Sequence, residues 1–331
     1  MKKFAFKILL LSFPLIVLVG LFFLLDPFRL FHTYSNYSDN MFVEPNRDFV
    51  SGKMFLKNVE KYHYNSFIFG SSRTMAYKTD SWRKHLPNSA SPFVFDASGE
   101  SIFGIYTKIK FLDQMDAKLD NCLVILCTDC TFRQYDDHKG HIGIKYPGVA
   151  GTSWINFYVT FIKDYLDFNF LENYYQYLFT RIFTPSMKGY LETRKMKYDG
   201  VTNDVWILDQ EKEIQETPVA YYHKRKSIFY SRSSEITIAK QQIPNTPLNM
   251  LREISDIFKK HHTNYRIVIS PLYAQVRFNP KDLELLQNLF GKEFVFDFSG
   301  KNYFTEKVEN YYEDSHYRPI VGDSIMNIIY K

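Results

Sequence analysis

Apolar residues in this chain form short, largely apolar runs that alternate with stretches of helical spacing. The runs cover residues 66–69, 93–95, 122–126, 265–270 and 294–296. Between them, one helical face carries Ile102, Ile105, Ile109 and Leu112. Further helices are expected from Gly70 to about Trp82 and over residues 249–260, 281–290 and 320–330. Strands separated by helices in this way indicate a parallel sheet covered on both faces, so the pattern predicts a three-layer α/β/α fold with about five strands.

The alternation stops at residue 131 and resumes near residue 247. The stretch between is aromatic and irregular, with loop signals at Pro147-Gly148 and Thr184-Pro185. We interpret residues 131–246 as a mostly helical insertion within one α/β domain over residues 63–331. Ligands of open α/β sheets bind at the carboxyl ends of the strands, and the insertion is expected to cap that edge.

The N-terminus carries the longest apolar run. Lys2, Lys3 and Lys7 precede residues 8–25, which hold no charge, and Asp26-Pro27 ends the run. Eighteen helical residues span roughly 27 Å, close to the thickness of a hydrocarbon core. A cleaved signal peptide has a shorter apolar region and a small-residue cleavage site, and neither is present. The sequence therefore predicts a transmembrane signal anchor over residues 1–26 and a stalk or linker over residues 27–62.

The lysines before the run place the N-terminus in the cytoplasm by the positive-inside rule, so residues 27–331 are expected outside the cytoplasm. The whole chain holds 41 basic and 36 acidic residues. Without the three anchor lysines and Asp26, 38 basic and 35 acidic residues remain. No long basic block appears, and nucleic acid is not expected as a partner.

Three cysteines lie close together at Cys122, Cys127 and Cys130. We interpret Cys122 and Cys127 as small apolar residues of a buried strand. A local disulfide and a metal site are the alternatives, because the two-residue spacing of Cys127 and Cys130 occurs in both. A second group could also seat a metal but is interpreted as a polar loop: Asp136, Asp137, His138 and His141. No metal and no cofactor are predicted.

Two short segments about 240 residues apart carry the chemistry. Residues 70–73 (Gly-Ser-Ser-Arg) follow the first strand, and residues 313–316 (Glu-Asp-Ser-His) precede the last helix. A serine on a tight turn is exposed for attack, and an acid–histidine pair is what activates it. Taken alone, such serines are more often helix caps. Arg73 beside the turn is either a site for an anionic substrate group or a solvated side chain.

With both segments in place, the chain resembles the SGNH (GDSL-like) hydrolase superfamily over residues 64–130 and 245–331. More narrowly, it is similar to the membrane-anchored, extracytoplasmic branch that includes D-alanyl-transfer and alginate O-acetylation proteins. The resemblance implies a flavodoxin-like sheet and Ser72 as the nucleophile. It also implies His316 as the base, an acid at Glu313 where the family has Asp, and an oxyanion hole from the amides of Ser72 and Gly99.

The sequence departs from the family pattern at two places. The family carries an oxyanion-binding Asn after the third strand, where this chain has Thr128 and Asp129. Loss of one such donor costs about 2.7–4 kcal/mol of transition-state stabilisation. The Thr128 hydroxyl could substitute, whereas the Asp129 carboxylate would repel a developing oxyanion. The second departure is the acid: Glu313 is favoured for its three-residue spacing to His316, and Asp314 is the rival.

The resemblance implies a membrane-anchored serine O-acyltransferase or esterase that acts on a cell-surface polysaccharide. The expected partners are the glycan, an acyl donor, the membrane that holds the N-terminal helix, and an integral-membrane acyltransferase. The missing Asn supports the alternative of a non-catalytic SGNH-like module that binds glycan or docks a partner.

Overall fold

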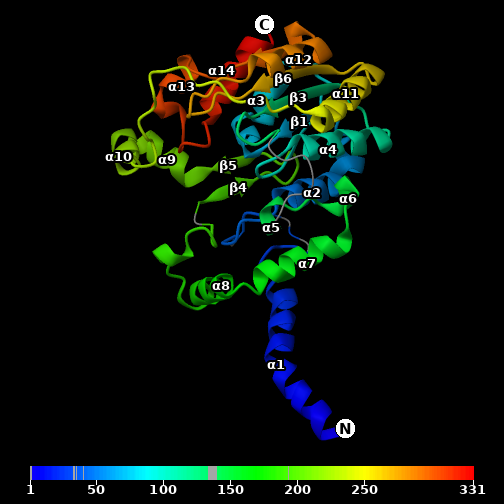
Figure 1. Cartoon of the computed structure of the whole chain (residues 1–331), viewed down its shortest axis with the longest axis vertical. Coiled ribbons are helices and arrows are strands. Elements are labelled where there is room, and N and C mark those ends of the chain that lie inside the picture. Colours follow the sequence, from blue (N-terminus) through cyan, green and yellow to red (C-terminus); the bar gives the residue numbers. More distant parts are fainter. Residues whose placement is uncertain (1, 33, 35, 40, 133–139, 193) are drawn as a thin grey trace.

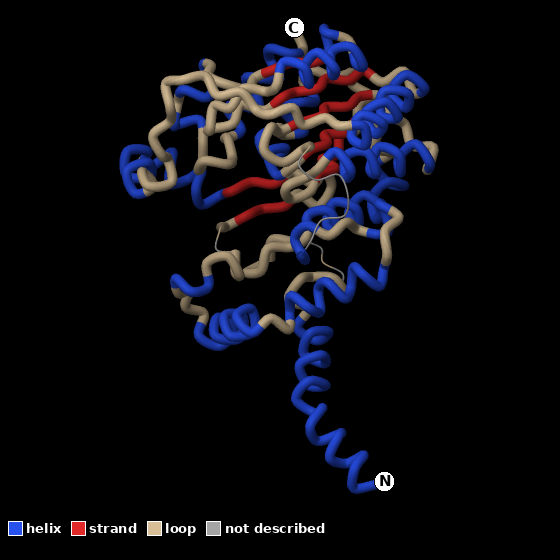
Figure 2. The backbone as a smooth tube through the Cα atoms, viewed as in Figure 1, coloured by secondary structure: helices blue, strands red, loops and turns tan. Residues whose placement is uncertain are grey.

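The chain forms an α/β body around one five-stranded parallel sheet. The computed structural model describes residues 2–32, 34, 36–39, 41–132, 140–192 and 194–331. The strands of the sheet are β1 (Ser66–Gly70), β2 (Pro92–Asp96), β3 (Asn121–Leu126), β6 (Asn264–Ile269) and β7 (Val295–Asp297). Their order across the sheet is β2-β1-β3-β6-β7, and every neighbouring pair is parallel. Figure 2 shows the strands in red. Counted along these five strands, this is the 2-1-3-4-5 order of flavodoxin-like sheets.

Helices surround this sheet (Figure 1). The α-helices are α1 (Lys2–Leu25), α2 (Arg47–Tyr62), α3 (Thr79–Arg83), α4 (Ile102–Gln114), α5 (Gly140–Gly143), α6 (Pro147–Ala150), α7 (Trp154–Tyr165), α8 (Phe168–Thr180), α9 (Leu208–Glu216), α10 (Pro218–Lys224), α11 (Asn245–Lys260), α12 (Pro280–Phe290), α13 (Tyr303–Glu306) and α14 (Pro319–Ile329). The 3₁₀ turns are η1 (Ser72–Ala76), η2 (Pro185–Met187), η3 (Lys292–Phe294) and η4 (Val308–Asn310).

Alternate residues of each strand enter two separate cores, as the period of two in a strand requires. Phe67 and Phe69 of β1 belong to a core shared with α2, α4, α11 and α12. Ile68 of the same strand belongs to a second core with α3 and α14. Both faces of the sheet are therefore covered, which gives the three layers that the apolar strands predicted.

Most elements of the sheet lie close to their predicted positions. The helix predicted after Gly70 differs, because it is divided into the 3₁₀ turn η1 and the short helix α3. Tyr77 separates the two with an extended backbone, and its ring is fully buried in the second core. The helix is interrupted at the residue whose ring packs into this core.

The prediction of a stalk over residues 27–62 is wrong. Residues 47–62 form α2, whose first turn is capped by Asn46, and Phe49 and Phe55 of this helix are buried in the first core. Phe28 is buried in the same core. The polar character of the segment concealed the helix because two of its charged residues, Arg47 and Asp48, are themselves buried and paired with charges inside the fold.

The inserted stretch contains helices α5 to α10 and a small antiparallel pair, β4 (Met196–Tyr198) and β5 (Val205–Ile207). It contacts the main sheet at the edge strand β2, where the Val94 N–H donates to the Thr202 carbonyl at 2.9 Å. Asp136, Asp137 and His138 of the predicted polar loop lie outside the described residues. His141 is described, and its Nδ1 is 2.7 Å from an Asp164 carboxylate oxygen.

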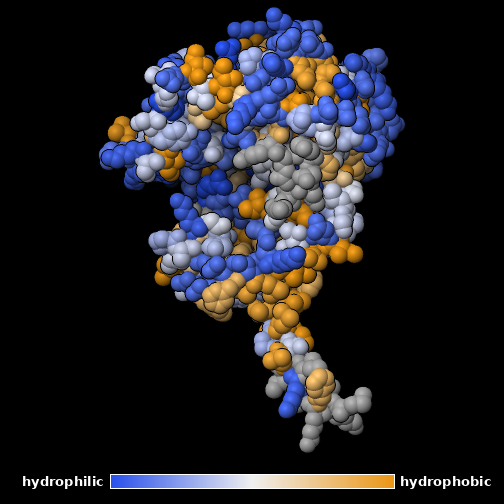
Figure 3. All heavy atoms as spheres, viewed as in Figure 1, coloured by the Kyte–Doolittle hydropathy of each residue, from blue (hydrophilic) through white to orange (hydrophobic). Residues whose placement is uncertain are grey.

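Helix α1 extends away from the body, and its C-terminal end joins the body beside α7 (Figure 1). There Phe22 is buried, with its ring 5.0 Å from that of Tyr165 and 6.3 Å from that of Phe28. In the part of the chain that the structure describes, no helix has the length and apolar character needed to cross a membrane. Figure 3 shows apolar side chains gathered at the base of the body, where α1 begins to project.

Candidate active site

The turn after β1 is shaped by Gly70. This residue has a φ of +151°, and a Cβ atom here would lie 2.7 Å from the Ile125 carbonyl oxygen. Only glycine fits such a backbone so close to the next strand. Ser71 then caps η1 by accepting a hydrogen bond from the Arg73 N–H at 3.4 Å. Ser72 is consequently the first residue of a 3₁₀ turn at the carboxyl end of β1, and its side chain is partly exposed.

Ser72, His316 and Glu313 form a continuous hydrogen-bonded chain. The Ser72 Oγ atom is 2.8 Å from His316 Nε2, although 244 residues separate them in sequence. On the other side of the ring, His316 Nδ1 is hydrogen-bonded to Glu313 Oε1. The second oxygen of Glu313 accepts from the Ser315 N–H at 2.7 Å. This order of hydroxyl, imidazole and carboxylate is the one that activates a serine nucleophile.

Glu313 is held in its charged form. Burial raises the pKa of this carboxyl, but hydrogen bonds from His316 and Ser315, together with the charges of His316 and Arg194, outweigh burial and leave the pKa below its usual range. A charged carboxylate here fixes the imidazole with Nδ1 protonated and leaves Nε2 free to accept the serine proton.

Asp314, the rival acid, is not in contact with the imidazole. Its carboxylate accepts a 3.5 Å hydrogen bond from the Ser315 hydroxyl. Burial and the neighbouring charge of Glu313 raise the pKa of Asp314. The structure therefore brings Glu313, and not Asp314, to His316.

Gly99 lies in the turn after β2, the strand that pairs with β1. Its φ of +57° is in the left-handed region, and no heavy atom lies within 4 Å of the position that a Cβ would take. Among the described residues, the backbone N–H groups of Ser72 and Gly99 have no hydrogen-bond acceptor. Both groups are thus free to donate to an oxyanion.

Arg73 and Asp129 contact each other rather than facing open solvent. Arg73 is 8% exposed, and it donates to both oxygens of Asp129, at 2.9 and 2.6 Å. It also donates from Nε to the Ser315 carbonyl at 2.9 Å. The solvated alternative for Arg73 is wrong, because this guanidinium is buried and paired with Asp129. Binding of an anionic substrate group by Arg73 stays a prediction.

Asp129 was expected to repel an oxyanion, but its charge is balanced by the bidentate pair with Arg73. Burial lowers the pKa of Arg73, yet the charges of Cys127, Asp129 and Cys130 outweigh this effect and raise it, so the guanidinium remains charged. The neighbouring Thr128 is buried, and its carbonyl accepts from the Gln242 side chain at 2.8 Å. The Thr128 hydroxyl has no hydrogen-bond partner among the described residues.

Sequence reasoning missed Asp96, the last residue of β2. It is fully buried, accepts from the Thr74 hydroxyl of η1 at 2.6 Å and is paired with Arg47 of α2. Asn203 of the insertion donates to its other oxygen at 3.3 Å. One carboxylate thereby fixes the nucleophile turn to two other segments. An acid directly after an apolar strand is the signal that the sequence offers for it.

The insertion also supports the loop that carries His316. The Tyr221 hydroxyl of α10 donates to the Tyr312 carbonyl at 2.7 Å. The loop closes on itself through the Tyr312 N–H, which donates to the His316 carbonyl at 2.9 Å. These contacts hold the imidazole at a fixed place above the strand ends.

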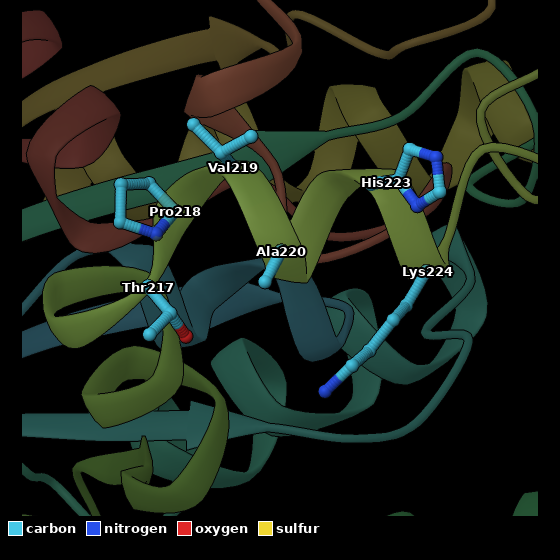
Figure 4. Close-up of a pocket in the computed structure, with 6 residues that line it drawn as sticks. All are labelled: Thr217, Pro218, Val219, Ala220, His223 and Lys224. Carbon is cyan, nitrogen blue, oxygen red and sulfur yellow. The ribbon is translucent and has the colours of Figure 1, made fainter.

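A separate surface hollow lies on α10 and is lined by six residues of that region (Figure 4): Thr217, Pro218, Val219, Ala220, His223 and Lys224. None of the three residues of the hydrogen-bonded chain takes part in it. Its lining is mostly apolar and holds no carboxylate, so the lining contains no acid to pair with His223. The chemistry of the molecule is therefore assigned to the edge of the sheet and not to this hollow.

Comparison with protein-family models and with curated proteins gives no match to this chain.

Proposed function

We propose that this protein is a serine acyl-transfer enzyme of the SGNH type, an O-acyltransferase or esterase that acts on cell-surface polysaccharide. The observation that carries the proposal is the Ser72–His316–Glu313 chain at the carboxyl edge of the sheet. Ser72 attacks the ester carbonyl while His316 takes its proton, and the same imidazole returns that proton to the leaving oxygen. Glu313 stabilises the imidazolium between these two steps.

The tetrahedral intermediate needs donors for its negative oxygen. The free N–H groups of Ser72 and Gly99 serve this purpose in the proposal, with the Thr128 hydroxyl as a third donor in place of the missing Asn. Because Arg73 balances the charge of Asp129, the carboxylate at this edge opposes the oxyanion less than the sequence alone suggested.

The polysaccharide substrate and the outward-facing location are supported by the family resemblance and by the uncharged N-terminal run over residues 8–25. An anchored enzyme stays near membrane-bound acyl donors and growing polymer, which favours transfer over free hydrolysis. The resemblance also supports an integral-membrane acyltransferase as the partner that supplies the acyl group.

The second candidate is a non-catalytic module that binds glycan or docks a partner. The absence of an Asn after β3 favours it, because Thr128 and Asp129 occupy that place. The two functions differ in one property that can be measured directly: only an enzyme has a serine that reacts with acylating and phosphonylating probes.

The test uses the full chain in detergent with a fluorophosphonate probe and p-nitrophenyl acetate. We expect the wild-type protein to be labelled on Ser72 and to release nitrophenol, and Ser72→Ala to lose both activities. The matched control is Ser324→Ala on α14, whose hydroxyl only donates to the Ile320 carbonyl at 2.8 Å. A folded wild-type chain that resists the probe contradicts the enzyme and leaves the binding module. A Ser72→Ala chain that still reacts contradicts Ser72 as the nucleophile.

A further inference from the structure

Two cysteines contact the residues on both sides of Ser72. Cys127 Sγ is 3.5 Å from the Ser71 hydroxyl, and Arg73 Nη1 is 3.6 Å from Cys130 Sγ. We propose that Cys127 and Cys130 are a reversible thiol–disulfide site that controls the alignment of Ser72 with His316. The effect on alignment rests on the proposed function, whereas disulfide formation does not.

The geometry of the turn after β3 suits a disulfide. The sulfur atoms of Cys127 and Cys130 lie within 4.8 Å of each other and of an Asp129 carboxylate oxygen. The turn is closed by the Thr131 N–H, which donates to the Cys127 carbonyl at 3.2 Å. Both cysteines are free thiols in this structure. A disulfide requires the sulfurs to approach to about 2.05 Å, so the turn must tighten when the bond forms.

The ionisation of the pair is also suited to thiol exchange. Burial raises the pKa of Cys127, but the hydrogen bond with Cys130 and the charge of Arg73 outweigh burial and lower it to about 6. The same hydrogen bond and burial raise the pKa of Cys130. One negative charge is therefore held between the two sulfurs, and the thiolate is the species that attacks a disulfide.

The surroundings favour a disulfide over a metal ion. Asp129 would be the third ligand, but both of its oxygens accept hydrogen bonds from Arg73. The Arg73 guanidinium also lies beside Cys130, so its positive charge occupies the place where a cation would have to bind. In the outward location of the proposed function, the compartment also permits a disulfide to persist.

The reaction balances with a small-molecule disulfide, such as oxidised glutathione, as the oxidant. Cys130 is the partly exposed sulfur, whereas Cys127 is buried. The proton that the two sulfurs share passes from Cys130 to Cys127 along their hydrogen bond. The Cys130 thiolate then attacks one glutathione sulfur, forms a mixed disulfide and releases one glutathione thiolate, which takes up the proton from Cys127. Cys127 then attacks Cys130 Sγ, forms the internal bond and releases the second thiolate. The protein loses two electrons and two protons, and the oxidant becomes two thiols.

Asp129 lies between the two cysteines, so a tighter turn displaces its carboxylate from Arg73. Arg73 follows Ser72 directly and also holds the Ser315 carbonyl beside His316 at 2.9 Å. Oxidation is therefore expected to loosen both the nucleophile turn and the histidine loop. A misplacement of about 1 Å at a reacting group slows chemistry by about 10²-fold.

The experiment equilibrates the full chain in glutathione buffers from reducing to oxidising, then alkylates the remaining thiols and measures the mass. We expect one internal disulfide between Cys127 and Cys130, and fluorophosphonate labelling slowed by roughly 10–100-fold over the same range of buffers. Cys130→Ser should label equally fast in all buffers. Cys122→Ala, which lacks the buried thiol near the start of β3, should respond as the wild-type chain does.

Thiols that stay open to alkylation at the oxidising end overturn the site, and a disulfide that leaves labelling unchanged overturns its control of Ser72. If the probe labels neither the reduced nor the oxidised protein, the proposed function fails. The mass after alkylation still shows whether the disulfide forms. Hydrogen exchange then tests whether the disulfide affects the segments that carry Ser72 and His316. Oxidation must reduce protection in peptides that cover residues 71–76 and 313–317, and unchanged protection contradicts it.

Discussion

At the scale of single residues, the arrangement around His316 assigns different roles to two adjacent acids. Glu313 contacts the imidazole and Asp314 does not. We expect Glu313→Gln to slow fluorophosphonate labelling by on the order of 10³–10⁴-fold, because a neutral amide cannot stabilise the imidazolium. Asp314→Asn, the matched control, should label near the wild-type rate. The reverse ranking of the two variants would assign the acid to Asp314.

The ionised Glu313 also links stability to pH. Its pKa is lowered in the folded protein, so the folded state binds fewer protons than the unfolded state at acid pH. The stabilisation is fully present above the ordinary glutamate pKa of about 4.3 and is lost as the pH falls through the lower folded value. Melting temperatures of wild type and Glu313→Gln should therefore converge as the pH falls below about 4.3. A difference that grows toward acid pH would contradict this sign.

At the scale of elements, a buried group of charges connects α2, α4 and the segment before α6. Glu100 follows Gly99 and precedes the cap of α4, and it is paired with Lys108 and Lys145. Asp48 of α2 is paired with Lys108 as well. All four side chains are at most 3% exposed. The group balances two acids against two bases and fixes the turn that carries Gly99.

Removal of one base should leave an uncompensated buried acid. We expect Lys108→Met to lower the free energy of unfolding by about 3–5 kcal/mol, measured by denaturant titration. Lys110→Met is the matched control on the same helix, since Lys110 and Glu253 form a pair in which both side chains are about half exposed. Its effect should be at most about 1 kcal/mol. Equal effects of the two variants would show that the buried group contributes nothing special.

The sequence predicts elements well where one physical signal dominates. The strands are apolar on both faces because helices cover both, so β3 and α4 lie where the pattern placed them. The helix α2 was missed because two of its charged residues, Arg47 and Asp48, form ion pairs inside the fold. Such pairing has no periodic pattern in the sequence.

The same limit applies to the site. The turn motif and the late acid–histidine segment predicted that Ser72 and His316 lie together, and their side chains are 2.8 Å apart. Arg73 and Asp129 are 56 residues apart in sequence, and their pairing follows only from the adjacency of β1 and β3. The negative charge of Asp129, which was expected to repel an oxyanion, is therefore neutralised by Arg73. No local sequence pattern predicts this ion pair.

At the scale of the whole molecule, one apolar surface lies where α1 meets the body. Exposed apolar side chains continue from α1 onto α7 and α8 at the base of the body (Figure 3): Leu11, Leu15, Val17, Trp154, Ile155 and Phe168. The Ser72 site lies in the body, away from the free end of α1. An anchor at this end would hold the site at a fixed height above a membrane and leave the sheet edge open to polymer.

Membrane retention tests the N-terminal anchor of the proposed function. We expect the full chain to remain with membranes after alkaline washing and Leu11→Lys/Leu15→Lys to be released, since each lysine in the middle of a spanning helix costs about 2.5–3.5 kcal/mol. Both leucines are more than half exposed, so these changes spare the packing of the body. Val219→Lys/Ile236→Lys, at positions of the body that are 84% and 74% exposed, adds the same two positive charges and should be retained. The control separates the effect of added charge from the effect of lost insertion. Release of the wild-type chain, or retention of the double variant, would contradict an anchor at α1.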